Sequence, residues 1–155
     1  MKNDTTFYSW TKFKNGIGSV ALVSLDVEQN SSNTNRILEH YCGQGFASQG
    51  NIEEVQESGY DSWKIAVRHG LQYAFSLIDT FWIVHVNKVE GRFATDTNPT
   101  IVGYTVLRAF FDKINYQLTD SQIERLEEFV LSSWTKPYKE LIPNFFDLTF
   151  TEFNV

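Results

Sequence analysis

Apolar and polar residues alternate in the first third of the chain, as they do in strands with one buried face. Residues 20–28 (VALVSLDVE) give the clearest case, and we predict a strand there. One face of this strand is uniformly apolar and is expected to point into the core: Ala21, Val23, Leu25 and Val27. An aromatic segment at 7–14 precedes it across the turn signal Asn15-Gly16, so 7–14 is a first strand or an irregular arm.

A third strand is predicted at residues 36–42 (RILEHYC), after a loop at 29–35 that contains no apolar residue. This loop favours an antiparallel pairing of the third strand with 20–28. Glycines then punctuate a long connection, in which residues 52–57 form a helical turn or two.

Helical spacing of apolar residues begins near residue 61. Asp61 and Ser62 are both good N-caps, and Gly70 lies beside the apolar stripe, where we expect it to allow close packing on the sheet. The stripe consists of Trp63, Val67, Leu71, Ala74 and Ile78. Residues 81–89 then form a strand whose first half is apolar on both faces, as in a central strand.

Two more helices follow. The first starts at Pro99, with Thr97 or Asn98 as its N-cap. Its apolar stripe consists of Gly103, Val106, Leu107, Phe110 and Ile114. The second starts at Thr119, where Gln122 completes a capping box. Its buried face is expected to hold Ile123, Leu126, Val130 and Trp134.

The element order is therefore β, β, β, α, β, α, α, β, because apolar and polar residues alternate again at 146–151. We predict a single α+β domain over residues 1–155, with two layers and a four-stranded, mostly antiparallel sheet that carries helices on one face. Residues 7–114 form its core, to which a C-terminal helix and an aromatic tail at 119–155 are added.

Three stretches, in this order along the chain, resemble domain IV of translation elongation factor G. They are KNGIGSVALVSLDVE at 14–28, YDSWKIAVRHGLQYAFS at 60–76 and VHVNKVEGRFATDTNPTIVGYTVLRAFF at 84–111. In that family a glycine-rich loop leads into an apolar strand, a helix has a Tyr near its start, and a strand ends in a D/E-G pair before a tip loop and a second helix. The resemblance covers roughly residues 14–114.

This resemblance implies a fold like that of ribosomal protein S5 domain 2, in which two helices pack on one face of a four-stranded sheet. The fold includes a left-handed β-α-β crossover. The family has a histidine in its tip loop, whereas Ala94 stands at the matching position here, in the loop Gly91–Asn98. No G-x-x-x-x-G-K-[ST] phosphate loop occurs in the chain.

Charge and aromatic content change the functional picture. The formal net charge is -6, and residues 119–155 carry seven acids against three bases. Phosphate backbones are bound through Lys and Arg, so this balance argues against nucleic acid and favours a basic partner. Aromatic residues make up 15% of the chain, which indicates a core rich in Phe or, for some of them, a contact surface.

The last third combines both properties. Acidic residues of the third helix form an outer face, and aromatic residues follow it. The candidate partner-binding residues are Asp120, Glu124, Glu127, Glu128, Trp134, Tyr138 and Phe146. An ordinary solvated helix face is the alternative interpretation of the acids.

We find no catalytic motif and therefore expect a non-enzymatic protein without a cofactor. His40 and Cys42 face the same side of a strand, but two ligands are too few for a metal site, and Cys42 is expected to be a buried, inert thiol. His69 is expected to face solvent or to bond a helix end. Asp96, Thr97 and Asn98 suit an anion site at a helix N-terminus, although ordinary capping explains them as well.

The leading hypothesis is a small cytosolic protein that binds a basic protein, such as an immunity protein or antitoxin that masks a nuclease toxin. The second is a translation-associated or RNA-binding factor, for which Lys12, Lys14, Arg68 and Arg92 would have to form a basic stripe. The third is a hydrolase or transferase with a dispersed site. A cytosolic location is expected because the N-terminus has no signal-peptide pattern and no apolar run reaches the ~20 residues of a membrane span.

Overall fold

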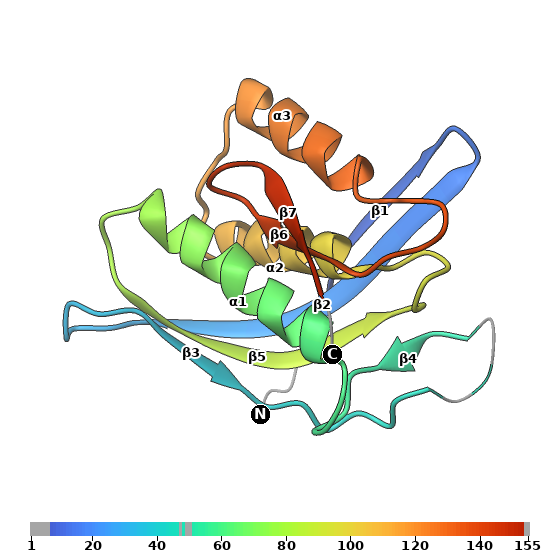
Figure 1. Cartoon of the computed structure of the whole chain (residues 1–155). Helices are drawn as coiled ribbons and strands as arrows, with labels where there is room; N and C mark the ends of the chain where they lie inside the picture. Colours follow the sequence, from blue (N-terminus) through green and yellow to red (C-terminus); the bar gives the residue numbers. More distant parts are fainter. Residues whose placement is uncertain (1–6, 47, 49–50, 154–155) are drawn as a thin grey trace.

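The computed structural model describes residues 7–46, 48 and 51–153, and it confirms an α+β architecture (Figure 1). The strands of the main sheet are β1 (Tyr8–Lys14), β2 (Ile17–Gln29), β3 (Arg36–Glu39), β4 (Glu53–Glu54) and β5 (Trp82–Gly91). The helices are α1 (Asp61–Ser76), α2 (Pro99–Lys113) and α3 (Asp120–Leu131). A C-terminal hairpin consists of β6 (Leu141–Asn144) and β7 (Thr149–Glu152).

The main sheet is mixed and has five strands in the described residues, so the predicted number of four is wrong. Its strand order is β1-β2-β5-β3, and the short β4 pairs with the end of β5. The pairs β1–β2, β2–β5 and β4–β5 are antiparallel, whereas the pair β3–β5 is parallel.

The predicted antiparallel pairing of the third strand with the second is also wrong. β5 lies between β2 and β3, because it is the strand whose apolar residues suit a central position. The polar loop between β2 and β3 crosses the start of β5 and forms hydrogen bonds to it near both ends of the loop. Asn30 N–H donates to the Phe81 carbonyl at 2.8 Å, and Trp82 N–H donates to Asn35 Oδ1 at 2.8 Å.

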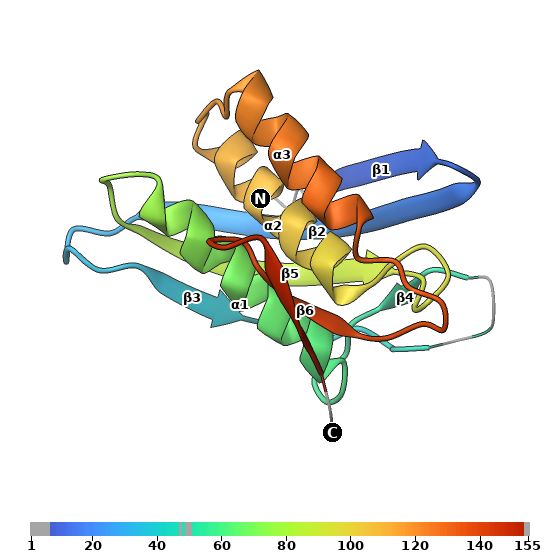
Figure 2. The same cartoon turned by 45° about the horizontal axis from the view of Figure 1, so that its top comes forward.

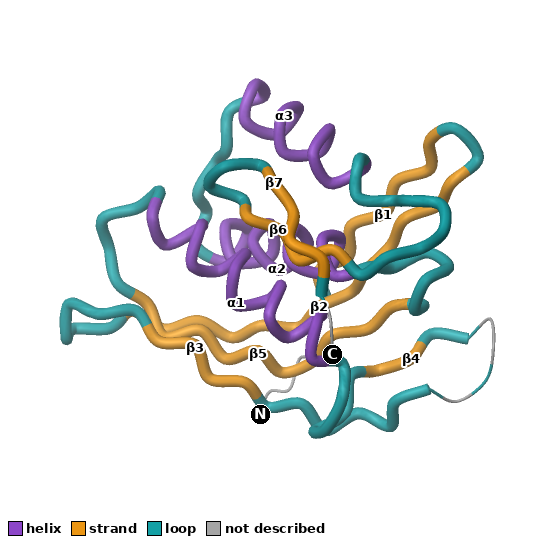
Figure 3. Tube along the Cα trace, viewed as in Figure 1, coloured by secondary structure: helices purple, strands orange, loops and turns teal. Residues whose placement is uncertain are grey.

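Helices α1 and α2 cover one face of the sheet, and the core lies between these layers (Figures 1 and 3). The predicted inward face of β2 is confirmed for Ala21, Val23 and Leu25, whereas Val27 is only half-buried. Large side chains of both helices complete the core: Trp63, Leu71, Tyr104, Leu107, Phe110 and Phe111.

The two glycines Gly70 and Gly103 bring α1 and α2 into backbone contact. A Cβ at Gly70 would lie 2.3 Å from the Gly103 carbonyl oxygen, and a Cβ at Gly103 would lie 2.7 Å from the Ala66 carbonyl oxygen. Gly70 therefore serves the packing of helix on helix, and not of helix on sheet as predicted.

The helix starts differ in how well the sequence predicts them. Asn98 caps α2 by accepting from Ile101 N–H at 2.9 Å, and the capping box of Thr119 and Gln122 is present at α3. The predicted caps of α1 are wrong, because Asp61 and Ser62 are its first helical residues. The residue before them, Tyr60, has a left-handed φ of 58° and makes no side-chain cap.

The C-terminal segment forms a partial third layer over the helices. Figures 1 and 2 show α3 and the hairpin on the side of α1 and α2 that faces away from the sheet. Phe129, Val130 and Phe145 from this segment belong to the same buried cluster as the sheet residues. The predicted single last strand is instead a hairpin, with Phe146 and Leu148 in its turn.

Candidate functional site

Three of the predicted acids form a row on the outside of α3. Asp120, Glu124 and Glu128 follow one another at four-residue spacing and are exposed. None of the three has an ion-pair partner among the described residues. Like charges at this spacing repel each other slightly, so a basic partner would relieve this repulsion. We call these residues the acidic stripe.

The prediction that Glu127 belongs to the outer face is wrong. Its side chain is 17% exposed and points towards β1 and α2. Glu127 Oε2 accepts from Trp10 Nε1 at 3.1 Å and from the Tyr104 hydroxyl at 2.9 Å. Lys12 Nζ and Arg108 Nη1 each lie 3.4 Å from its carboxylate oxygens. Glu127 thus fastens α3 to the rest of the domain.

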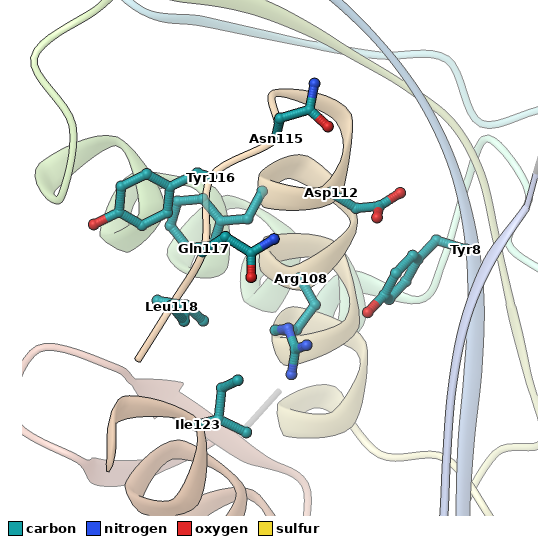
Figure 4. A pocket seen from close by; sticks show the side chains of 9 residues that line it. Tyr8, Arg108, Asp112, Asn115, Tyr116, Gln117, Leu118 and Ile123 are labelled. Carbon is teal, nitrogen blue, oxygen red and sulfur yellow. The ribbon is translucent and has the colours of Figure 1, made fainter. Parts of the chain in front are cut away.

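A small cleft of about 130 Å³ lies beside this network, and Figure 4 shows its lining. Arg108 is in its centre, between Tyr8 on one side and Gln117 and Ile123 on the other. Arg108 Nη1 donates to the Tyr104 hydroxyl at 2.7 Å and also faces the Glu127 carboxylate. The Arg108 guanidinium is therefore already paired with a carboxylate, and Asp112 adds a second one to the lining, so the cleft offers no unpaired cation that would hold an anion.

Two predicted aromatic residues join a third that the sequence reasoning missed. The ring centroids of Trp134 and Tyr138 are 6.1 Å apart, and Tyr138 meets Phe93 edge to face at 5.8 Å. Trp134 is anchored by its Nε1, which donates to Ser19 Oγ at 3.0 Å. Phe93 is 43% exposed and lies in the tip loop after β5. Phe93, Tyr138 and Trp134 are called the aromatic strip.

Phe146, the remaining predicted aromatic residue, does not join this strip. It lies in the β6–β7 turn, is 60% exposed and meets Tyr73 of α1 edge to face at 5.3 Å. His69 and Phe146 line one small hollow, and His69 Nδ1 is 2.9 Å from the Pro143 carbonyl oxygen. His69 is therefore half-buried and bonded to the hairpin, where the sequence predicted a solvent-facing or cap-bonded side chain.

A larger cavity of about 360 Å³ opens at the N-terminal end of α1. It is lined by Glu53, Gly59, Tyr60, Asp61, Ser62, Trp63, Phe93, Glu140 and Phe153. Four of these residues are aromatic and three are acidic, and no Lys or Arg lines the cavity. We call it the α1 cavity. The aromatic strip leads to it, because Phe93 belongs to both.

The carboxylates of the α1 cavity are partly satisfied by neutral donors. Glu53 is 5% exposed, and it accepts from the Tyr60 hydroxyl and, at 3.0 Å, from Phe93 N–H. Glu140 accepts from the Ser62 hydroxyl. Burial raises the pKa of Tyr60, and its hydrogen bond to Glu53 raises this pKa further. No local sequence pattern indicates this site, because its residues come from five separate segments.

The tip loop Gly91–Asn98 is tied down by its own hydrogen bonds. Thr97 Oγ1 donates to the Val20 carbonyl at 2.6 Å and accepts from Arg92 N–H at 2.7 Å. Asp96 pairs with Arg92 at 3.0 Å, and Asn98 caps α2. These contacts favour the capping interpretation over an anion site.

The uncovered face of the sheet carries two histidines in contact. His40 Nε2 lies 3.0 Å from His85 Nδ1, and His85 Nε2 lies 3.3 Å from Glu28 Oε2. Cys42 is exposed, so the prediction of a buried thiol is wrong, because this residue lies past the end of β3. In the part of the chain that the structure covers, no group of three or more His, Cys, Asp or Glu side chains could hold a metal ion.

No protein-family model matches this chain, and the search of curated proteins gave no match either. The resemblance to elongation factor G domain IV therefore stays a prediction. None of the helices in the described residues has the length and apolar character that a membrane span requires.

Proposed function

We propose that this protein is a non-catalytic binding protein for a basic protein, of the type of an immunity protein or antitoxin that masks a nuclease toxin. The acidic stripe is the observation that carries this proposal. Three exposed carboxylates in a row, which form no ion pair within the described part of the chain, make a surface that attracts Lys and Arg side chains. In a nuclease these side chains would be the ones that bind phosphate.

The surroundings of the acidic stripe suit such an interface. Trp134 and Tyr138 of the aromatic strip come directly after α3 in the chain, and Phe93 packs against Tyr138. Interfaces commonly combine an aromatic centre with a polar rim. The net charge of -6 adds a long-range attraction for a basic partner, which accelerates encounter.

Co-expression with the product of the neighbouring gene, and capture from a native extract, test whether a basic partner exists. With the partner in hand, we expect the double variant Glu124→Lys, Glu128→Lys to slow association by about tenfold or more at low salt. The variant Asp79→Lys, Asp26→Lys carries the same change of charge away from α3 and serves as the control. The proposal fails if neither approach yields a basic partner, or if both variants associate equally.

The alternative is a translation-associated or RNA-binding factor with a fold like ribosomal protein S5 domain 2. The strand order β1-β2-β5-β3 supports that fold, and so does the position of α1 in the chain, after β3 and before its parallel partner β5. The basic side chains argue against RNA binding, because carboxylates already accompany them. Lys12, Arg68 and Arg92 each lie within 3.4 Å of a carboxylate oxygen, from Glu127, Glu39 and Asp96 respectively. Salt-sensitive co-sedimentation with ribosomes would favour this alternative.

A further inference from the structure

We propose that the α1 cavity is an anchor site for an arginine side chain of the basic partner. This inference rests on the proposed function in taking the partner to be basic. It concerns a different surface from the acidic stripe, and the two can be tested separately.

The carboxylates of the cavity call for a cation. Glu53 is 5% exposed, yet its described partners are the neutral Tyr60 hydroxyl and Phe93 N–H. Asp61 and Glu140 line the same cavity, and no basic side chain does. A carboxylate removed from water is costly unless a cation or several donors compensate it, and a bound guanidinium brings both.

The walls favour a guanidinium over an ammonium group. The Tyr60 and Trp63 rings are 5.1 Å apart at 59°, and Phe93 and Phe153 line the cavity with them. A guanidinium is planar and weakly hydrated, stacks on aromatic faces and forms forked bonds to carboxylates, whereas an ammonium is strongly hydrated. The volume of about 360 Å³ falls within the usual range of small-ligand pockets.

Trp63 supplies an independent indication of a missing ligand. The residue is 1% exposed and lines the cavity, and its Nε1–H has no hydrogen-bond partner among the described atoms. Buried donors in folded proteins are almost always paired. The unpaired indole N–H of Trp63 therefore marks an unsatisfied donor in the wall of the cavity, and it serves as a reporter of any ligand bound there.

The test is an NMR titration of the ¹⁵N-labelled protein with N-acetyl-arginine amide. We expect saturable shifts at the Trp63 indole N–H, which is assigned with Trp63→Phe, and at the Phe93 amide. The affinity of a single residue is expected in the millimolar range. The neutral isostere N-acetyl-citrulline amide should give no saturable shift, and N-acetyl-lysine amide should bind more weakly.

Glu140→Gln and Asp61→Asn keep the shape of the cavity, and each should weaken the binding of the arginine derivative by about tenfold. Asp79→Asn removes an exposed carboxylate that belongs neither to the cavity nor to the acidic stripe, so it is the matched control and should bind as the wild type does. Equal binding of the citrulline derivative, or the absence of a saturable shift at Trp63, would overturn the proposal.

The partner distinguishes this proposal from the broader one. If the arginine derivative binds but does not compete with the partner, the cavity takes a free organic cation and the anchor role is wrong. If the derivative binds and no basic partner exists, the proposed function falls and the cation site stands. If the acidic-stripe variants weaken binding of the partner while Glu140→Gln and Asp61→Asn do not, the anchor proposal is wrong and the proposed function stands.

Discussion

Glu127 lies on α3 and accepts hydrogen bonds from Trp10 of β1 and Tyr104 of α2. Its spacing explains this inward position. Residue 127 is four positions after Ile123 and three before Val130, so all three lie on one face of the helix, and that face packs on the domain. The Glu127 carboxylate therefore adds polar contacts to the apolar packing of α3 on the domain.

Glu127→Ala is expected to lower the free energy of unfolding by about 2–4 kcal/mol, because it leaves the Trp10 and Tyr104 donors and the Arg108 guanidinium without their acceptor. Urea denaturation measures this change. Glu128→Ala, one residue further and exposed, should stay within about 0.5 kcal/mol of the wild type. Equal effects of the two variants would contradict the inward role of Glu127.

At the scale of elements, the contact between α1 and α2 sets how closely the two helices pack against each other. Most residues of α2 and half of those of α1 are buried, and the glycine pair lets the two backbones touch. The N-terminal end of α1 forms part of the α1 cavity, so the tilt of this helix also positions Tyr60, Asp61 and Trp63.

Gly70→Ala is expected to destabilise the protein by about 1–3 kcal/mol, although alanine is the better helix former. The reason is that the new Cβ would lie 2.3 Å from the Gly103 carbonyl oxygen and would push the helices apart. Gln72→Ala is the control, since Gln72 is an exposed residue of the same helix. Thermal unfolding of both variants gives the comparison, and a stabilised Gly70→Ala would refute the close contact.

On the scale of the whole molecule, six carboxylates gather at two places of the described structure, three in the acidic stripe and three in the α1 cavity. Of four tyrosines with a raised pKa, Tyr104 is buried and the other three are half-buried. Burial is the main cause that raises the pKa of each of them: Tyr41, Tyr60, Tyr104 and Tyr138.

The raised pKa values of these tyrosines predict that the free energy of unfolding falls at alkaline pH. A tyrosine whose pKa is higher in the folded than in the unfolded state keeps its proton when the unfolded chain loses it. The free energy of unfolding is therefore unaffected by these groups below about pH 10, the ordinary value, and falls as the pH rises above it. Denaturation at a series of alkaline pH values measures this fall.

Tyr138→Phe gives the sharpest comparison with the wild type. The buried Tyr138 hydroxyl has no hydrogen-bond partner in the described structure, so its removal should leave stability at neutral pH unchanged or slightly higher. The alkaline fall should become shallower, because one of the groups that causes it is gone. An identical pH dependence would contradict the raised pKa of Tyr138.

Local patterns in the sequence determined much of this architecture. The alternation in β2, the apolar β5, the helical stripes of α1 and α2, and the caps at Asn98 and Thr119 depend on neighbours within one turn or one strand. Such signals are local and are therefore readable from the chain. They also gave the exposed acids Asp120, Glu124 and Glu128 of the candidate site.

The tertiary structure alone decided which segments meet. The sequence could not show that β5 separates β2 from β3, that Gly70 faces Gly103, or that Glu127 turns inward, because each depends on a partner far along the chain. The α1 cavity has the same origin. Glu53 and Glu140 stand 87 positions apart in the numbering, and only folding brings them around one hollow with Trp63.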